Sequence, residues 1–460
     1  MADVSISYKG NEIASMNATG VKTLLTSSAF CEDDITVSYT KPSGGGPVSR
    51  KQVNFIDYDG TILYSYTKAE ITAMTSESDL PANPSHTGLT AQGWNWTLTQ
   101  IKAQLTAVPD GEVWVGQMYV TSSGNTEIDV SMPACRLEPV LSIAVNGTIK
   151  IDWGDNTSQS TVTGTSLTSR KEPRHTYSTP GDYTISISVV SGSFQFYCGT
   201  NYLLLRKYNI TSYTQEMVYA NCVRAVRVGT GVTSIYDYTF YECHSLSYVT
   251  IPKSITSILT NAFRGCYSLL SVTIPSGITN ISQYEFGTCY KMVCVSIPSS
   301  VTSIDGYSIY NCYGISSVTI PNGVTSVGNY GISYCRSLSK LVLPNNLTSI
   351  GSNSLCSNHS LSSIIIPNGL TTIGASALYD CPAVSSITIP SSVTSIGNSA
   401  FQNCYGVKEY HILPTSVPTG GTNMFSSLPS DCVIYVPTAS LNAYKTSSNW
   451  STYASYMQGE

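Results

Sequence analysis

Residues 367–412 read PNGLTTIGASALYDCPAVSSITI followed by PSSVTSIGNSAFQNCYGVKEYHI, two segments of 23 residues that share their proline, cysteine and aliphatic positions. The period continues upstream without a slip. Prolines recur every 23 residues at Pro252, Pro275, Pro298, Pro321, Pro344, Pro367 and Pro390. Self-similarity at a fixed period of this length indicates a repeat architecture, in which each unit buries its apolar face against its neighbours. We therefore expect a solenoid over residues 229–413.

The buried positions of one repeat are those that stay apolar from copy to copy. Counting from each proline, aliphatic residues stand at positions 3 and 6, an apolar residue at 11, and aliphatic residues again at 17, 20 and 22. The closing segment, LxxVxI, alternates as a half-buried strand does, so stacked copies should form a parallel ladder. Eight coils at the roughly 4.8 Å spacing of neighbouring strands predict a rod on the order of 40 Å long.

The composition of the 460-residue chain disfavours several classes of partner. Charged residues make up 11% of it, the net charge is −5, and no run of Lys or Arg occurs. Nucleic acid and anionic membrane surfaces are bound by clustered basic side chains, so neither partner is expected. The longest apolar stretches are strand-sized, far below the roughly 20 residues of a membrane-spanning helix, so no membrane insertion is expected.

Half of the 14 cysteines fall at one position of the repeat, 14 places after the proline. They are Cys243, Cys266, Cys289, Cys312, Cys335, Cys381 and Cys404. Free Cys is among the most buried residue types, and no CxxC pair or Cys/His spacing typical of zinc occurs. We expect a buried ladder of free thiols rather than disulfides or a metal site.

The chain ahead of the repeats divides into shorter pieces. Period-two alternation predicts strands at Val4–Tyr8 and Ile35–Tyr39, and the Gly/Pro-rich segment Lys41–Pro47 marks a boundary. The next block predicts a small α+β module with one helix, Trp96–Ala107, and a core that includes Trp94, Trp96 and Trp114. Its predicted strands are Val53–Ile56, Ile62–Tyr66, Val113–Val120 and Glu127–Val130.

Beyond Met132 the pattern becomes all-β, and residues 151–156, IDWGDN, are its most distinctive segment. His175-Thr-Tyr177 follows, and then Gly181–Val189, whose alternation predicts a half-buried strand. These residues resemble the polycystic-kidney-disease-type (PKD) immunoglobulin-like domain. Asn156 replaces the usual second glycine, which a tight turn tolerates because Asn also adopts positive φ. The resemblance implies an immunoglobulin-like β-sandwich that acts as a spacer.

The repeat consensus IPxxVTSIGxxAFxxCxxLSSVT resembles the BspA-like leucine-rich repeat family, over residues 232–412. The tail strengthens the resemblance. Residues 431–437, 443–445 and 450–453 look like the closing segment typical of that family, which implies a cap on the end of the stack. Family members are surface and adhesion proteins of bacteria and protists, and similar arrays occur in bacteriophage proteins, so the resemblance implies binding.

The amino-terminal pieces carry a second resemblance. Residues 9–14, 30–37, 55–61 and 93–96, together with the Gly-rich linker, are similar to modules of phage and prophage structural proteins of gut Firmicutes. The start of the chain lacks the basic region and long apolar core of a signal peptide. A virion protein that assembles in the host cytoplasm and leaves by lysis needs none, and the reducing cytosol suits unpaired thiols.

Together these observations predict a mainly β, multidomain protein. Its expected parts are a small β N-terminal, virion-attachment module (1–42), a Gly/Pro linker (43–47), the α+β module (48–132), the PKD/Ig-like sandwich (133–200), a connector and N-terminal cap (201–228), the leucine-rich repeat solenoid (229–413) and a C-terminal cap (414–460).

One motif points towards catalysis. Asp57-Tyr-Asp59-Gly-Thr61 copies the DxDGT signature of haloacid-dehalogenase-type phosphatases, in which the first Asp is the nucleophile. That fold needs a doubly wound domain longer than the segment available before the all-β region. We therefore interpret the motif as a strand followed by a turn nucleated by Asp-Gly, and we expect the protein not to be an enzyme.

Other chemistry has little support in the sequence. Neither GxSxG nor an activated cysteine occurs, and the histidines are dispersed without a ligand partner at i+3 or i+4. The histidines are His86, His175, His244, His359 and His411. Asp152 and Asp155 could bind calcium, but a turn held by side-chain-to-backbone hydrogen bonds is the favoured interpretation. No metal and no cofactor is predicted.

Tyrosine supplies the candidate binding residues. Tyr outnumbers Phe 32 to 9, and the excess lies at two outward positions of the repeat, directly after the cysteine and two places before position 11. Tyr offers rigid contact area and a hydroxyl at low entropy cost, and its faces stack on sugars. The alternative is that these rings only cover the edges of the core. The candidate ligand-binding residues are Tyr238, Tyr267, Tyr284, Tyr290, Tyr307, Tyr313, Tyr330, Arg336 and Tyr405.

The predicted function is adhesion to, or receptor binding on, the bacterial host surface by a phage virion protein. Residues 229–413 contain six basic and six acidic side chains, so a neutral glycan or a polar protein epitope suits them better than a polyanion. Other virion proteins would bind the N-terminus, and a homo-oligomer is possible. The expected location is the virion surface, on a tail or head appendage. The alternatives are a bacterial cell-surface adhesin and a structural capsid or tail decoration protein without a receptor.

Overall fold

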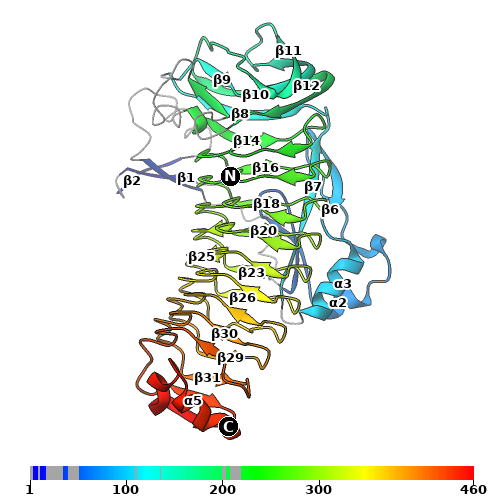
Figure 1. The fold of residues 1–460 in the computed structure, drawn as a ribbon. Helices are drawn as coiled ribbons and strands as arrows, with labels where there is room; N and C mark the ends of the chain where they lie inside the picture. Colours follow the sequence, from blue (N-terminus) through cyan, green and yellow to red (C-terminus); the bar gives the residue numbers. More distant parts are fainter. Residues whose placement is uncertain are drawn as a thin grey trace.

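The computed structural model gives a mainly β protein organised around a rod of stacked coils (Figure 1). It describes residues 4–8, 11–16, 35–39, 51–108, 111–134, 136–198, 204–207 and 219–460. The predicted fold class, mainly β with a C-terminal solenoid, is confirmed. None of the helices in these ranges has the length and apolarity needed to cross a bilayer.

The two strands predicted near the N-terminus are present as β1 (Val4–Tyr8) and β3 (Ile35–Tyr39). They form a three-stranded antiparallel sheet with β2 (Asn11–Met16), in which β1 lies in the middle. The predicted linker at residues 43–47 lies outside the described residues.

The solenoid coils contribute short strands to parallel ladders, and along most of the rod the paired residues are 23 positions apart, as in Val272 opposite Val295 and Ile281 opposite Ile304. The first ladder uses the LxxVxI segments, as predicted. It contains β14 (Val223–Arg227), β16 (Tyr248–Thr250), β18 (Ser271–Thr273), β20 (Cys294–Ser296), β23 (Ser317–Thr319), β26 (Lys340–Val342), β29 (Ser386–Ile389), β31 (Glu409–Ile412), β33 (Val433–Val436) and β34 (Met457–Gly459).

The second ladder runs along another side of the rod, through the residues around position 6 of the repeat. It contains β15 (Ser234–Ile235), β17 (Ser257–Ile258), β19 (Asn280–Ile281), β21 (Ser303–Ile304), β24 (Ser326–Val327), β27 (Ser349–Ile350), β28 (Thr372–Ile373), β30 (Ser395–Ile396) and β32 (Thr419–Gly420). A shorter pairing joins β22 (Ile309–Tyr310) to β25 (Ile332–Ser333).

The solenoid has about ten turns, so the predicted number of eight is too low. The additional turns lie at the ends, where the first ladder continues through β14, β33 and β34. One extra residue enters the period near the C-terminal end, since Ser395 pairs with Thr419 and Pro390 and Pro414 are likewise 24 residues apart. A search for prolines at intervals of 23 residues therefore stops at this point, although the strand pairing continues. Beyond β33, the chain forms η3 (Thr438–Ser440), α5 (Leu441–Thr446) and η4 (Ser451–Tyr456) at the end of the rod.

The interior of the coils is filled by the predicted apolar columns. Phe240, Phe263 and Phe286 stack through successive coils with ring centroids 5.1 and 5.6 Å apart. The seven repeat cysteines are buried and free, as predicted. From the second one onwards, each thiol contacts a backbone carbonyl of the preceding coil, as Cys312 Sγ does with Phe286 O at 3.0 Å. The ladder therefore also provides hydrogen bonds between coils.

One coil has Asn358 where the others have cysteine. Asn358 Nδ2 donates to Ile332 O at 2.9 Å, the same contact that the thiols make. Its Oδ1 accepts from the backbone N–H of Cys335 at 3.0 Å. A buried amide can replace a thiol here because every polar atom of its side chain that points inwards finds a backbone partner.

The β-rich segment before the solenoid forms the N-terminal end of the rod. The long strands β11 (Ser160–Lys171) and β12 (Gly181–Phe196) both pair antiparallel with β10 (Ile143–Asp152), and β9 (Pro139–Leu141) pairs with β13 (Leu205–Lys207). The large sheet has the order β11-β10-β12-β8-β14-β16, so it runs without a break into the first ladder of the solenoid. Its fourth strand, β8 (Thr126–Met132), belongs in the predicted division to the preceding α+β module.

The IDWGDN segment forms a compact turn. Asp152 Oδ1 accepts from Gly154 N at 2.9 Å, Asp155 Oδ1 accepts from Thr157 N at 3.2 Å, and Asn156 has φ +62°. The interpretation of both carboxylates as turn-forming groups is thereby confirmed. Around them, the His175 ring stacks on Trp153 with centroids 5.0 Å apart.

The α+β module has a four-stranded sheet of order β5-β4-β7-β6 and two helices. Its elements are β4 (Val53–Ile56), β5 (Ile62–Tyr66), α2 (Lys68–Ala73), η2 (Glu77–Asp79), β6 (Leu89–Trp94), α3 (Leu98–Ala107) and β7 (Val113–Thr121). The predicted helix is therefore present but starts two residues later, because Thr97 caps it and forms a capping box with Gln100. Trp96 belongs to the module core and Trp94 packs against that core, whereas Trp114 points away from it and its Nε1 donates to Ser317 Oγ at 3.1 Å.

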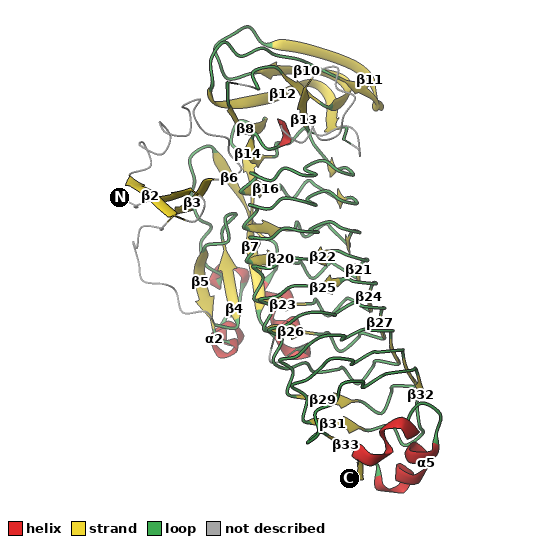
Figure 2. Ribbon diagram, turned by 90° about the vertical axis from the view of Figure 1, so that its left-hand side faces the viewer, coloured by secondary structure: helices red, strands yellow, loops and turns green. Residues whose placement is uncertain are grey.

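The α+β module lies along one flank of the solenoid (Figure 2). Strand β7 is buried along its whole length because it packs between the rest of its own sheet and the strands β16, β18 and β20 of the first ladder. The sequence gives no indication of this arrangement, since the contacting residues are about 200 positions apart. Part of the strand face of the solenoid is therefore covered by the same chain.

Candidate binding surface

Four of the predicted tyrosines stand at left-handed backbone positions. Tyr238, Tyr284, Tyr307 and Tyr330 have φ values of +61°, +54°, +59° and +57°. The same position of other coils also has positive φ, but carries smaller residues, namely Asn261, Asn353, Ser376, Ser399 and Asn423. The conformation therefore belongs to a corner of the coil, and it costs an L-residue other than Gly or Asn about 1–2 kcal/mol.

Three of these rings form a first tyrosine row, made of Tyr284, Tyr307 and Tyr330. Tyr284 and Tyr307 stack with centroids 4.4 Å apart, Tyr307 and Tyr330 with centroids 4.7 Å apart, and both pairs are inclined by 11°. The guanidinium of Arg264 lies over the outer face of the row, 4.5 Å from the centroid of Tyr284. The edge of Tyr310 contacts Tyr307 and Tyr330.

A second tyrosine row follows the cysteine column and consists of Tyr267, Tyr290 and Tyr313. The ring centroids are 4.7 and 4.9 Å apart, with inclinations of 22° and 11°. His244 stacks on Tyr267 at 4.0 Å, and Arg336 lies over Tyr313 at 5.1 Å. Both end faces of this row are therefore covered by polar or cationic groups.

The stacking determines which atoms of the two rows a ligand can reach. Within each row one ring covers the face of the next, so ring edges and hydroxyl groups remain for contact with other molecules. Burial, followed by the neighbouring Glu242, raises the pKa of Tyr267 to about 12, and burial also raises the pKa of Tyr284, Tyr290 and Tyr330. These phenols are neutral near pH 7 and can donate hydrogen bonds.

The remaining predicted residues lie apart from the two rows. Tyr238 contacts Tyr241 edge-on at 5.3 Å, and Arg264 lies between Tyr241 and the first row. Tyr405 is 54% exposed and lies four coils beyond Tyr313 in the same column. The structure thus brings seven of the nine predicted residues into stacked rows or their ends and leaves Tyr238 and Tyr405 outside them.

Sequence reasoning missed several aromatic residues of this surface. Tyr310 and Tyr334 meet edge-on at 5.3 Å beside the first row, and Tyr334 also has positive φ, +59°. Position 13 of the repeat, where Tyr334 stands, has positive φ in successive coils, including Thr288 and Asn311. The frequent Asn, Gly, Ser and Asp at that position is the signal that could have identified this second corner.

The DxDGT segment forms the predicted strand and turn. Gly60 N donates to Asp57 O at 3.0 Å, Gly60 has φ +82°, and Thr61 N donates to Asp59 Oδ1 at 2.9 Å. The Asp57 carboxylate is buried and is bound by Tyr119 Oη at 2.9 Å and His86 Nε2 at 2.7 Å. Tyr58 packs on Tyr248 of the solenoid. The Asp57 side chain thus anchors a turn at the contact between module and solenoid.

The histidines, dispersed in the sequence, all lie beside carboxylates. The pairs are His86 with Asp57 (2.7 Å), His175 with Asp155 (2.6 Å), His244 with Glu242 (2.5 Å), His359 with Asp380 (2.9 Å) and His411 with Glu460 (2.8 Å). Among the described residues, no group of three or more His, Cys, Asp or Glu side chains is arranged to hold a metal ion.

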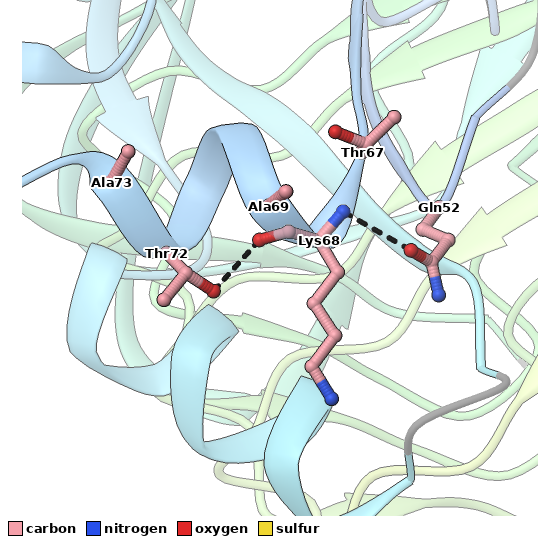
Figure 3. Close-up of a pocket in the computed structure, with 6 residues that line it drawn as sticks. All are labelled: Gln52, Thr67, Lys68, Ala69, Thr72 and Ala73. Atoms are coloured by element: carbon pink, nitrogen blue, oxygen red, sulfur yellow. Dashed lines mark hydrogen bonds between the residues drawn. The ribbon is translucent and has the colours of Figure 1, made fainter.

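A shallow hollow in the surface lies over α2 (Figure 3). It is lined by Gln52, Thr67, Lys68, Ala69, Thr72 and Ala73. Its polar groups bind one another: Lys68 N donates to Gln52 Oε1 at 3.1 Å, and Thr72 Oγ1 donates to Lys68 O at 2.7 Å. Lys68 Nζ turns away to Leu105 O, at 2.8 Å. This hollow therefore offers no set of free polar groups to a ligand.

Coils of 23 residues, each closed by an LxxVxI strand in a parallel ladder, define a leucine-rich-repeat solenoid. A family model described as BspA type Leucine rich repeat region matches in 6 copies over residues 211–339 and 325–443, just over half of the chain. The chain belongs to the BspA-type leucine-rich repeat family, which confirms the resemblance of its repeats. The fold fits a binding or adhesion role.

Solved structures with similarity to this chain include a leucine-rich repeat protein from Bacteroides ovatus, 23% identical with a TM-score of 0.38 over 46% of this chain and 66% of that one. A leucine rich cell surface protein from Faecalibacterium prausnitzii is 23% identical with a TM-score of 0.32 over 50% and 76%. The pneumococcal vaccine antigen PcpA is 20% identical with a TM-score of 0.30 over 45% and 68%. The chain thus spans slightly less than two thirds of the Bacteroides protein. A comparison with curated proteins gives no match.

Proposed function

We propose that this protein is an adhesion or receptor-binding protein of a bacteriophage virion, and that its solenoid binds a glycan or a protein on the host surface. The observation that carries the proposal is the presence of tyrosine at left-handed corners of the coil. Other coils place Asn or Ser at this position, as at Asn353 and Ser376. Backbone strain that persists at a surface position points to a use for the side chain.

The energies support this interpretation over a purely structural one. Three tyrosines in the first row cost about 1–2 kcal/mol each in left-handed strain. Their two stacked contacts return about 0.5–1.5 kcal/mol each beyond simple burial. Stacking therefore returns about 1–3 kcal/mol against a strain of about 3–6 kcal/mol, so stacking alone does not account for tyrosine at this position.

The exposed chemistry of the rows narrows the ligand. Interior ring faces are covered, so a sugar cannot stack on them as expected from an isolated tyrosine; it would meet ring edges and neutral hydroxyl donors. Arg264 is the charged side chain that lies over the first row, and its guanidinium is already in contact with the Tyr284 ring. A neutral or weakly charged ligand with many hydrogen-bond acceptors, such as a glycan or a polar protein epitope, suits this surface.

The virion location rests on the resemblance of the amino-terminal pieces to phage structural modules. In this proposal residues 1–42 attach to other virion proteins during assembly in the host cytoplasm, and the solenoid projects from the virion surface. A bacterial cell-surface adhesin and a decoration protein without a receptor are the alternatives. Neighbouring genes for capsid, portal or tail assembly support a virion protein; their absence together with surface-export genes supports the adhesin.

The binding surface can be tested with labelled full-length protein and intact cells of cultured gut Firmicutes, measured by flow cytometry. The triple variant Tyr284→Asn, Tyr307→Asn, Tyr330→Asn should stay folded, because Asn suits the left-handed position, and should lose binding to cells that the wild-type protein binds. Tyr64→Ser, which removes an exposed tyrosine of the α+β module, is the control that should bind normally.

Treatment of the cells separates the two ligand classes. Periodate treatment should abolish binding if the receptor is a glycan, and protease treatment should abolish it if the receptor is a protein. Undiminished binding by the triple variant would reject the tyrosine rows as the site. A wild-type protein that binds none of the strains would favour the decoration protein.

A further inference from the structure

The hydroxyl groups of the second tyrosine row receive no hydrogen bond from, and donate none to, the described residues. In the first row, by contrast, the hydroxyl groups of Tyr284 and Tyr307 interact with each other. Tyr267, Tyr290 and Tyr313 therefore each have a proton that a ligand can accept. The second row is the part of the candidate surface with three free donors in line.

The α+β module lies on another side of the coils and leaves this row uncovered (Figure 2). Its hydrogen bonds to the solenoid go to the residue before the repeat proline in three coils, and a fourth bond follows in the next coil. The four contacts are Asn95 Nδ2 to Ile274 O (2.9 Å), Trp96 Nε1 to Ile297 O (3.0 Å), Gln104 Nε2 to Ile320 O (3.1 Å) and Asn345 Nδ2 to Ala107 O (2.6 Å). Among the described residues of the module, none hydrogen-bonds to the second row.

The positions on both sides of the row carry mostly small side chains. Two places before the tyrosines come Gly265, Thr288 and Asn311, and directly after them come Ser268, Lys291 and Gly314. The three rings are half-buried and stack on one another, so their edges and hydroxyl groups face the outside. A chain-like ligand can therefore lie along the whole row.

The row presents hydrogen-bond donors. The phenols are joined by the guanidinium of Arg336, 5.1 Å from the centroid of Tyr313, and by the exposed ammonium group of Lys291. Both cations are donors only, and the electropositive edges of the rings also attract acceptor atoms. A donor that the ligand brings to such a surface is left unpaired, at a cost in affinity. A sugar hydroxyl brings a donor with its acceptor, whereas a proline residue brings a carbonyl and no N–H.

We propose that the second tyrosine row binds a proline-rich segment of a host-surface protein, which lies along the rod in the polyproline II conformation. This inference rests on the proposed function and names the ligand class of this row. A polyproline II helix has no internal hydrogen bonds, so its carbonyl groups need partners outside the helix. Its conformation exists before binding, so little conformational entropy is lost on the tyrosine row.

The repeat distances of the row and of this ligand agree. The ring centroids are 4.7 and 4.9 Å apart, and two coils advance by about 9.4–9.8 Å. A polyproline II helix has three residues per turn and rises about 9.3 Å in one turn. Carbonyl groups on one side of the helix therefore recur at Tyr267 and Tyr313, and the edge of Tyr290 contacts the pyrrolidine ring between them.

Other regular peptide conformations do not match this spacing. An α-helix has a pitch of about 5.4 Å, and an extended strand repeats about every 6.4–6.8 Å. Neither repeat coincides with one coil or with two coils, so equivalent groups of such a ligand would not meet successive tyrosines. The spacing therefore favours the polyproline II conformation among peptide ligands.

Fluorescence anisotropy with the full chain and a labelled peptide of about twelve prolines, four turns of the helix, tests the proposal. The wild-type protein should bind this peptide. A Gly-Ser peptide of the same length is flexible and has an N–H at every residue, so it should bind at least about tenfold more weakly. Because the peptide is uncharged, the affinity should change less than about twofold between about 0.05 and about 0.5 M salt.

The geometry predicts unequal effects within the row. The double variant Tyr267→Phe, Tyr313→Phe keeps the stacked rings and removes two donors, so it should weaken peptide binding about tenfold. Tyr290→Phe, the same change at the middle ring, should weaken it only about twofold, since this residue makes an edge contact that Phe retains. Tyr64→Phe, at an exposed tyrosine of the α+β module, is the control and should bind as the wild-type protein does.

Three results would overturn the proposal. They are binding of the Gly-Ser peptide as tight as that of the proline peptide, equal losses in the double variant and in Tyr290→Phe, and binding that falls steeply with salt. The last result would indicate an acidic ligand for Lys291 and Arg336.

Binding to intact cells separates this inference from the proposed function. If both are right, the proline peptide should compete with the cells, and protease rather than periodate should remove the receptor. Cell binding by a protein that does not bind the proline peptide would reject the proline-rich ligand and leave adhesion intact. Peptide binding by a protein that binds no cells would reject adhesion alone.

Discussion

Gly116 of β7 and Thr273 of β18 are so close that a methyl group on Gly116 would stand 2.1 Å from Thr273 Oγ1. Gly116 also donates its backbone N–H to Asn95 Oδ1 at 2.8 Å, and Asn95 in turn binds the solenoid through Ile274 O. The backbone of the module therefore rests directly on the strand face of the solenoid. Module and solenoid are built as one unit at this point.

We predict that Gly116→Ala destabilises the protein by about 1–3 kcal/mol, the usual range for a methyl group forced into a filled interface. Urea unfolding should show a lower midpoint, and limited proteolysis should cut between module and solenoid sooner. Gly277→Ala is the matched control, since its new methyl group would lie 3.6 Å from Ile255 O, an ordinary contact. Equal stability of both variants would contradict the close packing.

Glu285 should make the stability depend on pH. Its side chain is fully buried, Oε2 accepts from Ser282 N at 2.8 Å, and Oε1 has no hydrogen-bond partner in the described structure. Burial raises the pKa of Glu285 well above its ordinary value, against the opposing effect of the Ser282 hydrogen bond. The folded protein then keeps a proton that the unfolded chain has lost, so stability falls as pH rises from the ordinary pKa towards the raised one.

Replacing Glu285 by Gln removes this titration. We expect Glu285→Gln to be more stable than wild type near pH 8, by on the order of 1 kcal/mol or more, and about equally stable near pH 4. Thermal unfolding at both pH values measures the difference. Glu138→Gln, at an exposed position, should change neither value. A Gln variant that is less stable near pH 8 would show that the buried carboxylate is ionised and needed.

The left-handed strain of the first tyrosine row can be measured by comparison with the second row. Tyr307 and Tyr290 each stack on two neighbouring rings, but only Tyr307 has positive φ, +59°. Replacing either by Asn loses two stacked contacts, and only at Tyr307 does it relieve strain. We expect Tyr290→Asn to cost about 1–2 kcal/mol more than Tyr307→Asn in denaturant unfolding. Equal costs would remove the energetic basis of the proposed function.

The repeat cysteines should be unreactive in the folded protein. Cys266 and Cys289 are fully buried and contact Phe240 O and Phe263 O at 3.1 and 3.2 Å. Burial raises the pKa of both thiols, so little thiolate forms at neutral pH. Alkylation with iodoacetamide followed by peptide mass spectrometry should leave all seven repeat cysteines unmodified in native protein. The same treatment in denaturant should modify all of them, and native modification would show that the coils open locally.

The repeat register, the apolar columns and the strand segments of the module follow from the sequence because each depends on local spacing. The docking of module on solenoid does not. In the sequence, Asn95 resembles any polar residue and Trp96 any core residue. Their acceptors are backbone carbonyls about 200 positions away, and a backbone carbonyl is present at every residue whatever its type. Which half of the strand face is covered could therefore not be predicted.

The candidate surface was predictable in composition but not in geometry. The tyrosine columns are visible in the repeat, and Asn353 or Ser376 in the same column hints at a corner with special backbone conformation. Whether a column of rings fans outwards or stacks depends on side-chain rotamers and on coil spacing, which a column alone does not determine. Stacking at 4.4–4.9 Å changes the accessible chemistry from ring faces to ring edges.

The brace formed by Asn95, Trp96, Gln104 and Asn345 has a mechanical consequence. Hydrogen bonds between coils run along the rod, so tension at its C-terminal end breaks them one coil after another. The coils beyond Asn345 can separate in this manner, whereas the brace holds the coils from Ile274 to Asn345 against the α+β module. Both tyrosine rows belong to these fastened coils. A pulling force on a molecule bound at the tyrosine rows would therefore act on the coils that are held by the module as well as by their neighbours.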